Sequence, residues 1–359
     1  MTQQIPIKNL YYLLSYAWRF QSVGLEATLT EARYENSHDM MAALLCLASN
    51  YLAKRGLIRK YISEDETLRT IKGKVLLLDS VKAFASRNCQ VQCRYDDYTA
   101  NNELNRIIKT TMYLVLRDFR VAGELRHCLR TILSRYTEVQ EFDLHSLNNA
   151  LSNTTIKDRS YLFAIELCRL IVRGIGISNE TRNFHMRDFL GEQLVMHKIF
   201  EDFIFNFLKR HLKDQVKREN LKWDVQSFGA GSLFENRIPQ MRTDVTIVGD
   251  KLVRVVDAKY YQEALESYEG AKKYYRAHLS QLVDYLRTSQ TRHRKNVRGF
   301  LIYPTVGESL LPEQNTGTIN GYQVIIATID LALPWNQIHS QLLDILSYEP
   351  SFVSFADAV

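Results

Sequence analysis

Glycine, proline and long apolar runs are all scarce in this sequence. Its 359 residues include 15 glycines and 6 prolines, too few for a collagen-like or low-complexity chain. No stretch of about 20 apolar residues occurs, so no transmembrane segment is expected. The opening MTQQIPIKNLYYLLSYAW lacks a basic start and carries polar residues within its apolar part, unlike a signal peptide. These absences indicate a soluble, cytoplasmic protein.

The cysteines are few, odd in number and confined to the first half of the chain. There are 5 of them: Cys46, Cys89, Cys93, Cys128 and Cys168. A secreted disulfide framework would be denser and even-numbered, so we expect free thiols in a reducing cytoplasm. The alternative is a zinc site that combines Cys89 and Cys93 with His127 and Cys128, but this spacing fits zinc motifs poorly.

Positive and negative charges are nearly balanced, with 46 Lys and Arg against 40 Asp and Glu and a formal net charge of +6. Because 46% of the residues are hydrophobic and 24% are charged, the composition is globular and excludes a disordered chain. One local basic cluster suits contacts to phosphates. It comprises Arg287, Arg292, Arg294, Lys295 and Arg298. A solvated surface is the competing interpretation of this cluster.

The length suggests two domains, at about 150 residues each, and a turn-rich stretch at 172–180 places the boundary near residue 180. We therefore expect domains at 1–180 and 181–359 in a chain of the α/β class. The first half is predicted to be α+β, with a small β unit at about 57–98 among helices. The expected helices are 9–20, 38–55, 103–120, 123–135, 146–151 and 159–173.

The second half is predicted to form a mixed sheet flanked by helices, because β-branched runs alternate with amphipathic stretches. The expected strands are 243–248, 252–258, 299–303 and 322–328, and the expected helices are 194–212, 271–287 and 335–348. No G-x-x-x-x-G-K-[ST] motif occurs, and Gly174-Ile175-Gly176 lacks the third glycine of a dinucleotide fingerprint. We expect no nucleotide to be bound by this chain alone.

Two carboxylates and a lysine are predicted to converge at one end of a hairpin. A two-residue loop at Gly249-Asp250 would place Asp244 diagonally across from Asp257 on one face, which Lys259 shares. Two carboxylates, the backbone carbonyl of Ala258 and water would form an oxygen site suited to Mg²⁺. Lys259 would position water or stabilise negative charge. The competing interpretation is a solvated strand edge with an ordinary salt bridge.

Neighbouring helices offer three further polar residues. Glu201 forms a charged pair with Asp202 within the apolar surface of the preceding helix, where its carboxylate could reach the same site. Gln281 and Tyr285 are four residues apart on the helix that follows the hairpin, so they share a face. They would support the lysine or contact phosphates. Each residue taken singly is more often ordinary packing.

The order Glu201, Asp244, Asp257-x-Lys259, Gln281-x-x-x-Tyr285 resembles the PD-(D/E)xK nuclease superfamily. Thr243 stands where the motif has proline, and Asp257 takes the D/E position. The resemblance is closest to the McrC family of McrBC modification-dependent restriction systems. It rests on Pro6-Ile-Lys-Asn-Leu-Tyr-Tyr, Ile71-Lys-Gly-Lys74, Leu104-Asn-Arg-Ile-Ile-Lys109, Leu221-Lys-Trp-Asp224, Met241-Arg-Thr-Asp244, Val256-Asp-Ala-Lys-Tyr-Tyr261 and Leu301-Ile-Tyr-Pro304.

This resemblance implies a metal-dependent DNA endonuclease subunit that uses Asp244, Asp257 and Lys259 and acts with an McrB-like AAA+ GTPase hexamer on double-stranded methylated (5-methylcytosine) DNA. It implies that the GTP is held by the partner. Residues 1–180 would be the partner-binding domain that stimulates the GTPase, and 181–359 a restriction-endonuclease-like domain. The candidate partner contacts are the cations Lys72, Lys74, Lys82 and Arg87, and the basic cluster at 287–298 would bind DNA. The alternative is a non-catalytic adaptor that activates a GTPase ring and binds DNA passively.

Overall fold

The computed structural model of the protein describes residues 5–19, 36–80, 90–177, 184–186, 193–223, 237–260, 265–268, 271–305 and 309–350. The chain divides into two compact units. One combines Met1–Ser37 with Asp188–Val359, and the other is His38–Arg187. The second boundary lies close to the expected residue 180, but the assignment of the N-terminal segment differs from the expectation. That segment belongs with the C-terminal half.

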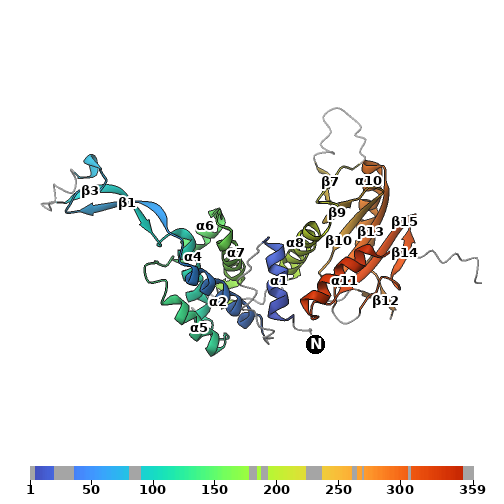
Figure 1. Ribbon diagram of the computed structural model, residues 1–359, viewed down its shortest axis with the longest axis horizontal. Helices are drawn as coiled ribbons and strands as arrows, with labels where there is room; N and C mark the ends of the chain where they lie inside the picture. Colours follow the sequence, from blue (N-terminus) through green and yellow to red (C-terminus); the bar gives the residue numbers. More distant parts are fainter. Residues whose placement is uncertain are drawn as a thin grey trace, which may run out of the picture. The chain divides into compact units, whose positions relative to one another are not determined.

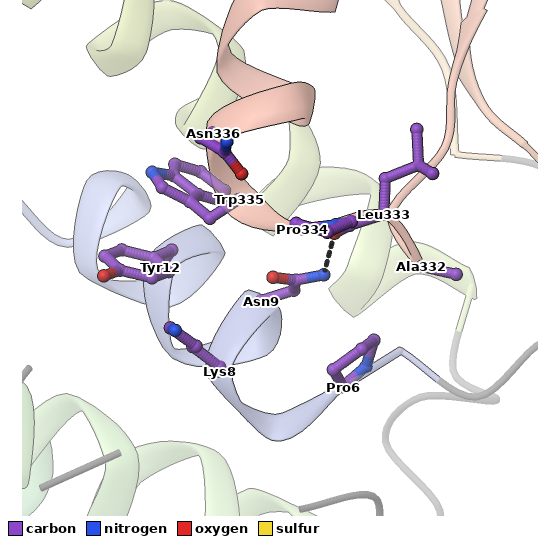
Figure 2. A pocket seen from close by; sticks show the side chains of 9 residues that line it. All are labelled: Pro6, Lys8, Asn9, Tyr12, Ala332, Leu333, Pro334, Trp335 and Asn336. Carbon is purple, nitrogen blue, oxygen red and sulfur yellow. Dashed lines mark hydrogen bonds between the residues drawn. The ribbon is translucent and has the colours of Figure 1, made fainter. Parts of the chain in front are cut away.

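The first helix explains this difference. Helix α1 (Ile7–Ala17) packs against α8 (Gln193–His211) and α11 (Trp335–Ser347) through buried apolar side chains such as Leu10 and Leu14. Its buried Asn9 donates from Nδ2 to the carbonyls of Leu331 and Leu333, at 2.8 and 2.7 Å. Figure 2 shows the hydrogen bond from Asn9 to Leu333 and, near it, the ring of Trp335, on which Tyr12 stacks at 4.6 Å between centroids.

The unit that contains the C-terminal half is built on a six-stranded mixed sheet of order β14-β15-β13-β10-β9-β6. Its strands are β6 (Gln215–Lys217), β9 (Val245–Val248), β10 (Leu252–Ala258), β13 (Asn296–Pro304), β14 (Thr316–Ile319) and β15 (Tyr322–Ile329). Strands β10, β13 and β15 run parallel, and the other neighbouring pairs are antiparallel. This arrangement confirms the expected mixed sheet flanked by helices.

Helices cover both faces of this sheet. Helix α10 (Arg276–His293) packs on one face through Leu282 and Leu286, in a core with Val255 and Leu301. A Cβ added at Gly299 of β13 would lie 2.8 Å from a Leu286 methyl group, so glycine permits this close approach. Helices α8 and α11 contact strands β10 and β15, and with α1 they belong to the same unit (Figure 1).

Three short two-stranded sheets also occur among the described residues. They are β7 (Asn220–Leu221) with β8 (Met241–Arg242), β11 (Glu266–Tyr268) with β12 (Ala271–Lys273), and β4 (Ile175–Ile177) with β5 (Phe184–Met186). The helix expected at 271–287 is observed as α10 (Arg276–His293), so it begins and ends later than predicted. Residues 271–273 form a strand because they pair with Glu266–Tyr268.

The unit His38–Arg187 consists of helices with a small β unit, as expected, but the β unit projects from the helices and does not lie among them. Its helices are α2 (Ser37–Arg55), α4 (Glu103–Arg117), α5 (Gly123–Leu133), α6 (Leu144–Asn153) and α7 (Arg159–Gly174). Strands β1 (Lys60–Leu68) and β3 (Val91–Thr99) form a long antiparallel ribbon that extends away from these helices in Figure 1. The short β2 (Lys74–Val75) pairs with β3. Within the expected β unit, residues 77–80 are helical.

Two expectations from composition can be compared with the described residues. Cys46, Cys93, Cys128 and Cys168 are free thiols, and Cys89 lies outside the described residues. Within the described ranges, no helix has the length and hydropathy needed to cross a membrane.

Candidate active site

The β9–β10 hairpin positions two carboxylates, with a register that differs slightly from the expected one. The backbone N–H of Gly249 donates to Leu252 at 3.0 Å, so the loop residues are Asp250 and Lys251 rather than Gly249 and Asp250. Continuing the observed register places Asp244 directly opposite Asp257. Because the shift is an even number of residues, both side chains remain on the face predicted from the sequence.

The backbone at the end of β10 anchors Asp244. Its Oδ2 accepts a hydrogen bond of 2.9 Å from the backbone N–H of Ala258. The N–H and C=O groups of one strand residue point to the same side of the strand, so the carbonyl of Ala258 also faces Asp244. The oxygen ligands predicted from the sequence are therefore on one side of the strand end.

Asp257 is fully buried next to a lysine. Its exposed fraction is 0%. Nζ of Lys259 forms an ion pair with Oδ2 at 3.1 Å. A buried carboxylate is strongly unfavourable unless a cation compensates its charge.

Helix α10 holds the lysine in place. Nζ of Lys259 donates to Oε1 of Gln281 at 2.9 Å, and Nε2 of Gln281 donates to the Tyr285 hydroxyl at 2.7 Å. These two bonds fix the orientation of the Gln281 amide, since its oxygen must face the ammonium group. The structure thus brings the predicted Gln281–Tyr285 pair to the lysine.

Glu201 approaches from helix α8 and is held by its own helix. Its Oε1 lies 2.9 Å from Nε2 of His197, and its Oε2 lies 3.2 Å from Nζ of Lys198. Burial disfavours the charged form of this carboxyl, but His197 and Lys198 outweigh that effect and lower its pKa. The negative charge of Glu201 contributes to raising the pKa of Asp244, so the two groups interact.

The charges in the site are unevenly balanced. Burial, followed by the charges of Asp257 and Glu201, raises the pKa of Asp244 well above its usual value. Burial also raises the pKa of Asp257, although Lys259 works against this shift. For Lys259 burial opposes the ammonium form, but Asp257 and Asp244 outweigh it and raise the pKa. The protein alone thus leaves an excess of negative charge, which favours binding of a cation.

The donor set suits a hard divalent cation. Within the described residues, no group of three or more His, Cys, Asp or Glu side chains is arranged to hold a metal ion. The available ligands are instead the carboxylates of Asp244 and Asp257 and the carbonyl of Ala258. Such an oxygen set, completed by water, is typical of Mg²⁺ sites, which usually retain several waters. It offers no soft ligand for zinc.

Comparison with known proteins identifies the family of the chain. Residues 3–304 match the family model described as McrBC 5-methylcytosine restriction system component. The chain belongs to this family. It is 28% identical over 342 residues to the type IV methyl-directed restriction enzyme EcoKMcrBC of Escherichia coli K12, covering 95% of this chain and 97% of that protein.

A solved structure shows the same fold. It is a half-complex from a tetradecameric assembly of Thermococcus gammatolerans McrB AAA+ hexamers with bound McrC. The TM-score is 0.57 with 17% sequence identity, and the alignment covers 95% of this chain and 75% of that chain. The likeness extends over both units, so this McrBC family member shares the whole fold rather than the sheet alone.

Sequence reasoning missed two residues at the candidate site. His197 contacts Glu201, and its spacing of four residues on one helix was the available signal. Glu219 is 3% exposed, and its backbone N–H donates to Oγ1 of Thr243 at 3.0 Å. Thr243, the residue at the proline position, thereby fixes the chain just before Asp244. Nothing in the sequence marks Glu219 as buried.

The predicted DNA-binding cluster is divided among different places. Arg298 pairs with Glu349 at 2.8 Å and lies on the sheet face opposite Gly299, away from α10 and the site. Lys295 donates to the carbonyl of Gly249, at the loop end of the hairpin and about 17 Å along the strand from Asp244. Arg292 donates to the carbonyl of Asn220. The exposed Arg287 and Arg294 remain the members best placed for a partner.

The predicted partner-contact cations are only partly described. Nζ of Lys72 lies 3.5 Å from the centroid of the Tyr95 ring, and Lys74 belongs to β2. Lys82 and Arg87 lie outside the described residues. The β1–β3 ribbon itself carries more acidic than basic residues. Its acidic residues are Glu64, Asp65, Glu66, Asp96 and Asp97.

Proposed function

We propose that this protein is the DNA-cleaving subunit of a methylation-directed restriction complex and a metal-dependent endonuclease. The observation that carries the proposal is the fully buried Asp257, which lies opposite Asp244 and is paired with Lys259 at 3.1 Å. Lys259 compensates only one of the two neighbouring carboxylates, and placing a second one there is unfavourable without another cation, so packing alone does not explain the group. A role in binding a cation and a phosphodiester does.

Mg²⁺ fits the residues present. Asp244, Asp257 and the carbonyl of Ala258 would hold it, with water filling the remaining positions. When bound, it would neutralise charge on a phosphodiester and lower the pKa of a water ligand. The excess negative charge between Asp244, Asp257 and Glu201 is the electrostatic reason to expect an affinity for a divalent ion.

The chain's own side chains would then act on the phosphate. Lys259 remains an ammonium because its pKa is raised by the neighbouring carboxylates, so it cannot serve as a base at neutral pH. It can stabilise negative charge that develops on the phosphate oxygens during hydrolysis. Gln281 accepts a hydrogen bond from it, which keeps the ammonium directed toward the site.

The partner would be an McrB-like AAA+ GTPase hexamer, acting in the cytoplasm on double-stranded methylated DNA. The named relatives support this part, since one is a methyl-directed restriction enzyme and another is an McrC bound to McrB hexamers. The projecting β1–β3 ribbon with the Lys72–Lys74 loop is the proposed contact with that partner. An added cation near a bound nucleotide accelerates phosphoryl transfer, which would explain stimulation of GTP hydrolysis.

The second candidate is a non-catalytic adaptor that activates the ring and binds DNA. The acidic ribbon and its basic loop would serve an adaptor equally well. An adaptor, however, gains nothing from Asp257 and Asp244 buried together with Lys259. Metal binding by the isolated chain therefore separates the two candidates, because the adaptor requires none.

Cleavage of methylated DNA by the complete complex tests the proposal. Asp257→Ala and Lys259→Ala should each lower the single-turnover rate by about 10²-fold or more, because each removes a group that acts on the charged transition state. Asp284→Ala, at an exposed position on α10, is the matched control. Calorimetry with Mg²⁺ should show binding to the wild-type chain and not to Asp257→Ala. Normal cleavage by a folded Asp257→Ala protein would remove the nuclease assignment.

A second experiment tests the division of labour. The unit boundaries indicate a fragment of residues 38–187, because a fragment of 1–180 would separate α1 from its packing partners α8 and α11. The 38–187 fragment should stimulate GTP hydrolysis by the partner without cleaving DNA. Stimulation by a protein that lacks 38–187 would contradict the assignment.

A further inference from the structure

One histidine links the helix that carries Glu201 to the strand end that carries Lys259. His197 of α8 uses both ring nitrogens: Nε2 lies 2.9 Å from Oε1 of Glu201, and Nδ1 accepts a 3.2 Å hydrogen bond from the backbone N–H of Tyr260. Its side chain is 26% exposed, so it lies at the rim of the site and not in the core. None of the roles proposed above uses this residue.

The two contacts determine the tautomer of the ring. Because Nδ1 accepts a hydrogen bond from an N–H group, it carries no proton. The single ring proton therefore resides on Nε2, which donates to the Glu201 carboxylate. A neutral imidazole in this tautomer bridges a backbone donor and a carboxylate acceptor, so it fixes both groups at once.

These contacts help to fix the backbone at the end of β10, next to Lys259. The backbone N–H of Lys259 donates to the carbonyl of Ile302 at 2.9 Å, which ties that residue to β13. The next residue, Tyr260, is tied by His197 to α8 instead. The backbone at Lys259 and Tyr260 is thus held by hydrogen bonds to two different elements, β13 and α8. The residue that holds Tyr260, His197, also orients the Glu201 carboxylate, which interacts with Asp244.

We propose that His197 is a positioning residue that couples Glu201 to the Lys259–Tyr260 end of β10. This inference rests on the proposed nuclease function. Lys198 also contacts Glu201, but its side chain is 59% exposed, and an exposed ion pair contributes little to positioning. Residues that orient the groups around a metal site typically change affinity or rate by about 10- to 100-fold when removed.

Three substitutions separate the two contacts. His197→Phe keeps a flat ring and removes both hydrogen bonds. His197→Asn places an acceptor near the position of Nδ1, which retains the Tyr260 contact, whereas His197→Gln places a donor near the position of Nε2, which retains the Glu201 contact. Lys198→Met is the control for the other contact to Glu201.

The measurement is the single-turnover cleavage rate of the complex at saturating DNA, together with Mn²⁺ binding by the isolated chain. His197→Phe should reduce the rate about 10- to 100-fold, and both His197→Asn and His197→Gln should lie between it and the wild type. Lys198→Met should cleave at nearly the wild-type rate. Glu201→Gln should cause a smaller loss in His197→Phe than in the wild type, because His197 acts in part through that carboxylate.

The outcomes distinguish this inference from the function on which it rests. If His197→Phe cleaves like the wild type, or if its effect adds fully to that of Glu201→Gln, while Asp257→Ala is inactive, the positioning role is wrong and the nuclease assignment stands. If Asp257→Ala cleaves normally, the nuclease assignment fails first. Nitrogen NMR of labelled histidine tests the bridge in either case, since a protonated Nδ1 in the wild-type chain overturns it.

Discussion

Asp244→Asn should stabilise the metal-free protein. Asp244 carries a charge that burial, Asp257 and Glu201 all oppose, which raises its pKa well above the usual value. Asparagine has nearly the same shape and keeps an oxygen that can accept the hydrogen bond from the N–H of Ala258. Lys259 keeps its ion pair with Asp257, so the substitution removes repulsion without leaving the lysine unpaired.

The size and sign of the effect follow from linkage. A raised pKa means that the folded chain binds a proton more readily than the unfolded chain, so stability falls as pH rises above the usual carboxyl pKa. The destabilisation that Asp244 causes at pH 7 cannot exceed about 4 kcal/mol, because a larger electrostatic penalty would be avoided by protonation of the carboxyl. Protonation costs about 1.4 kcal/mol for each pH unit above the usual carboxyl pKa, and pH 7 lies roughly three units above it. The stabilisation by Asp244→Asn should therefore be near zero at about pH 4 and should grow toward neutral pH.

Chemical denaturation with and without Mg²⁺ provides the assay. At neutral pH without metal, Asp244→Asn should raise the free energy of unfolding by about 1–4 kcal/mol. Mg²⁺ should stabilise the wild type and leave the variant nearly unchanged, because a ligand that binds only the folded state stabilises it. Asp284→Asn, at an exposed carboxyl, should show neither effect. A destabilised Asp244→Asn protein, or a difference independent of pH, would refute the reasoning.

Three further predictions concern positions outside the two carboxylates. Burial, with the nearby charge of Lys259, lowers the pKa of His278 to about 4. Stability should therefore fall by up to about 3 kcal/mol between pH 6.5 and pH 4, a loss that His278→Asn should largely remove in pH-dependent denaturation. Gly73→Ala should lower the melting temperature more than Gly56→Ala does, since both have positive φ but only Gly73 would place a Cβ 2.4 Å from a backbone oxygen. Arg298→Met should reduce stability and leave DNA affinity unchanged in a binding titration, because its guanidinium pairs with a carboxylate of the same chain.

Local sequence signals predicted most elements of the fold. The limits of β10 agree with the expected 252–258, and α2, α4 and α11 differ by three residues or fewer at their ends. These segments have strong periodicity or β-branched runs, with Gly56 ending α2 at a positive φ of 88°. The short strands β6, β7, β8 and β14 were not predicted, because two to four residues contain too little pattern to distinguish a strand from a loop.

The placement of α1 could not be predicted from local pattern. Its apolar residues indicated a buried helix correctly, but periodicity does not identify the surface that buries it. The deciding contacts join Asn9 to Leu331 and Leu333, more than 300 positions away in the sequence. Such long-range pairing depends on the completed fold, so the helix was assigned to the domain nearest in sequence.

The site and the basic cluster show why one pattern of charged residues was informative and the other was not. Asp244, Asp257 and Lys259 belong to one hairpin, where alternation fixes the face of each side chain and an even register error preserves it. The cluster from Arg287 to Arg298 passes from a helix through a turn into a strand, so neighbours in sequence point in different directions. Arg298 lies on the far face, Lys295 reaches the hairpin loop, and Arg292 contacts β7. Spacing therefore predicts a site when a single element or hairpin carries it, whereas proximity in sequence alone does not.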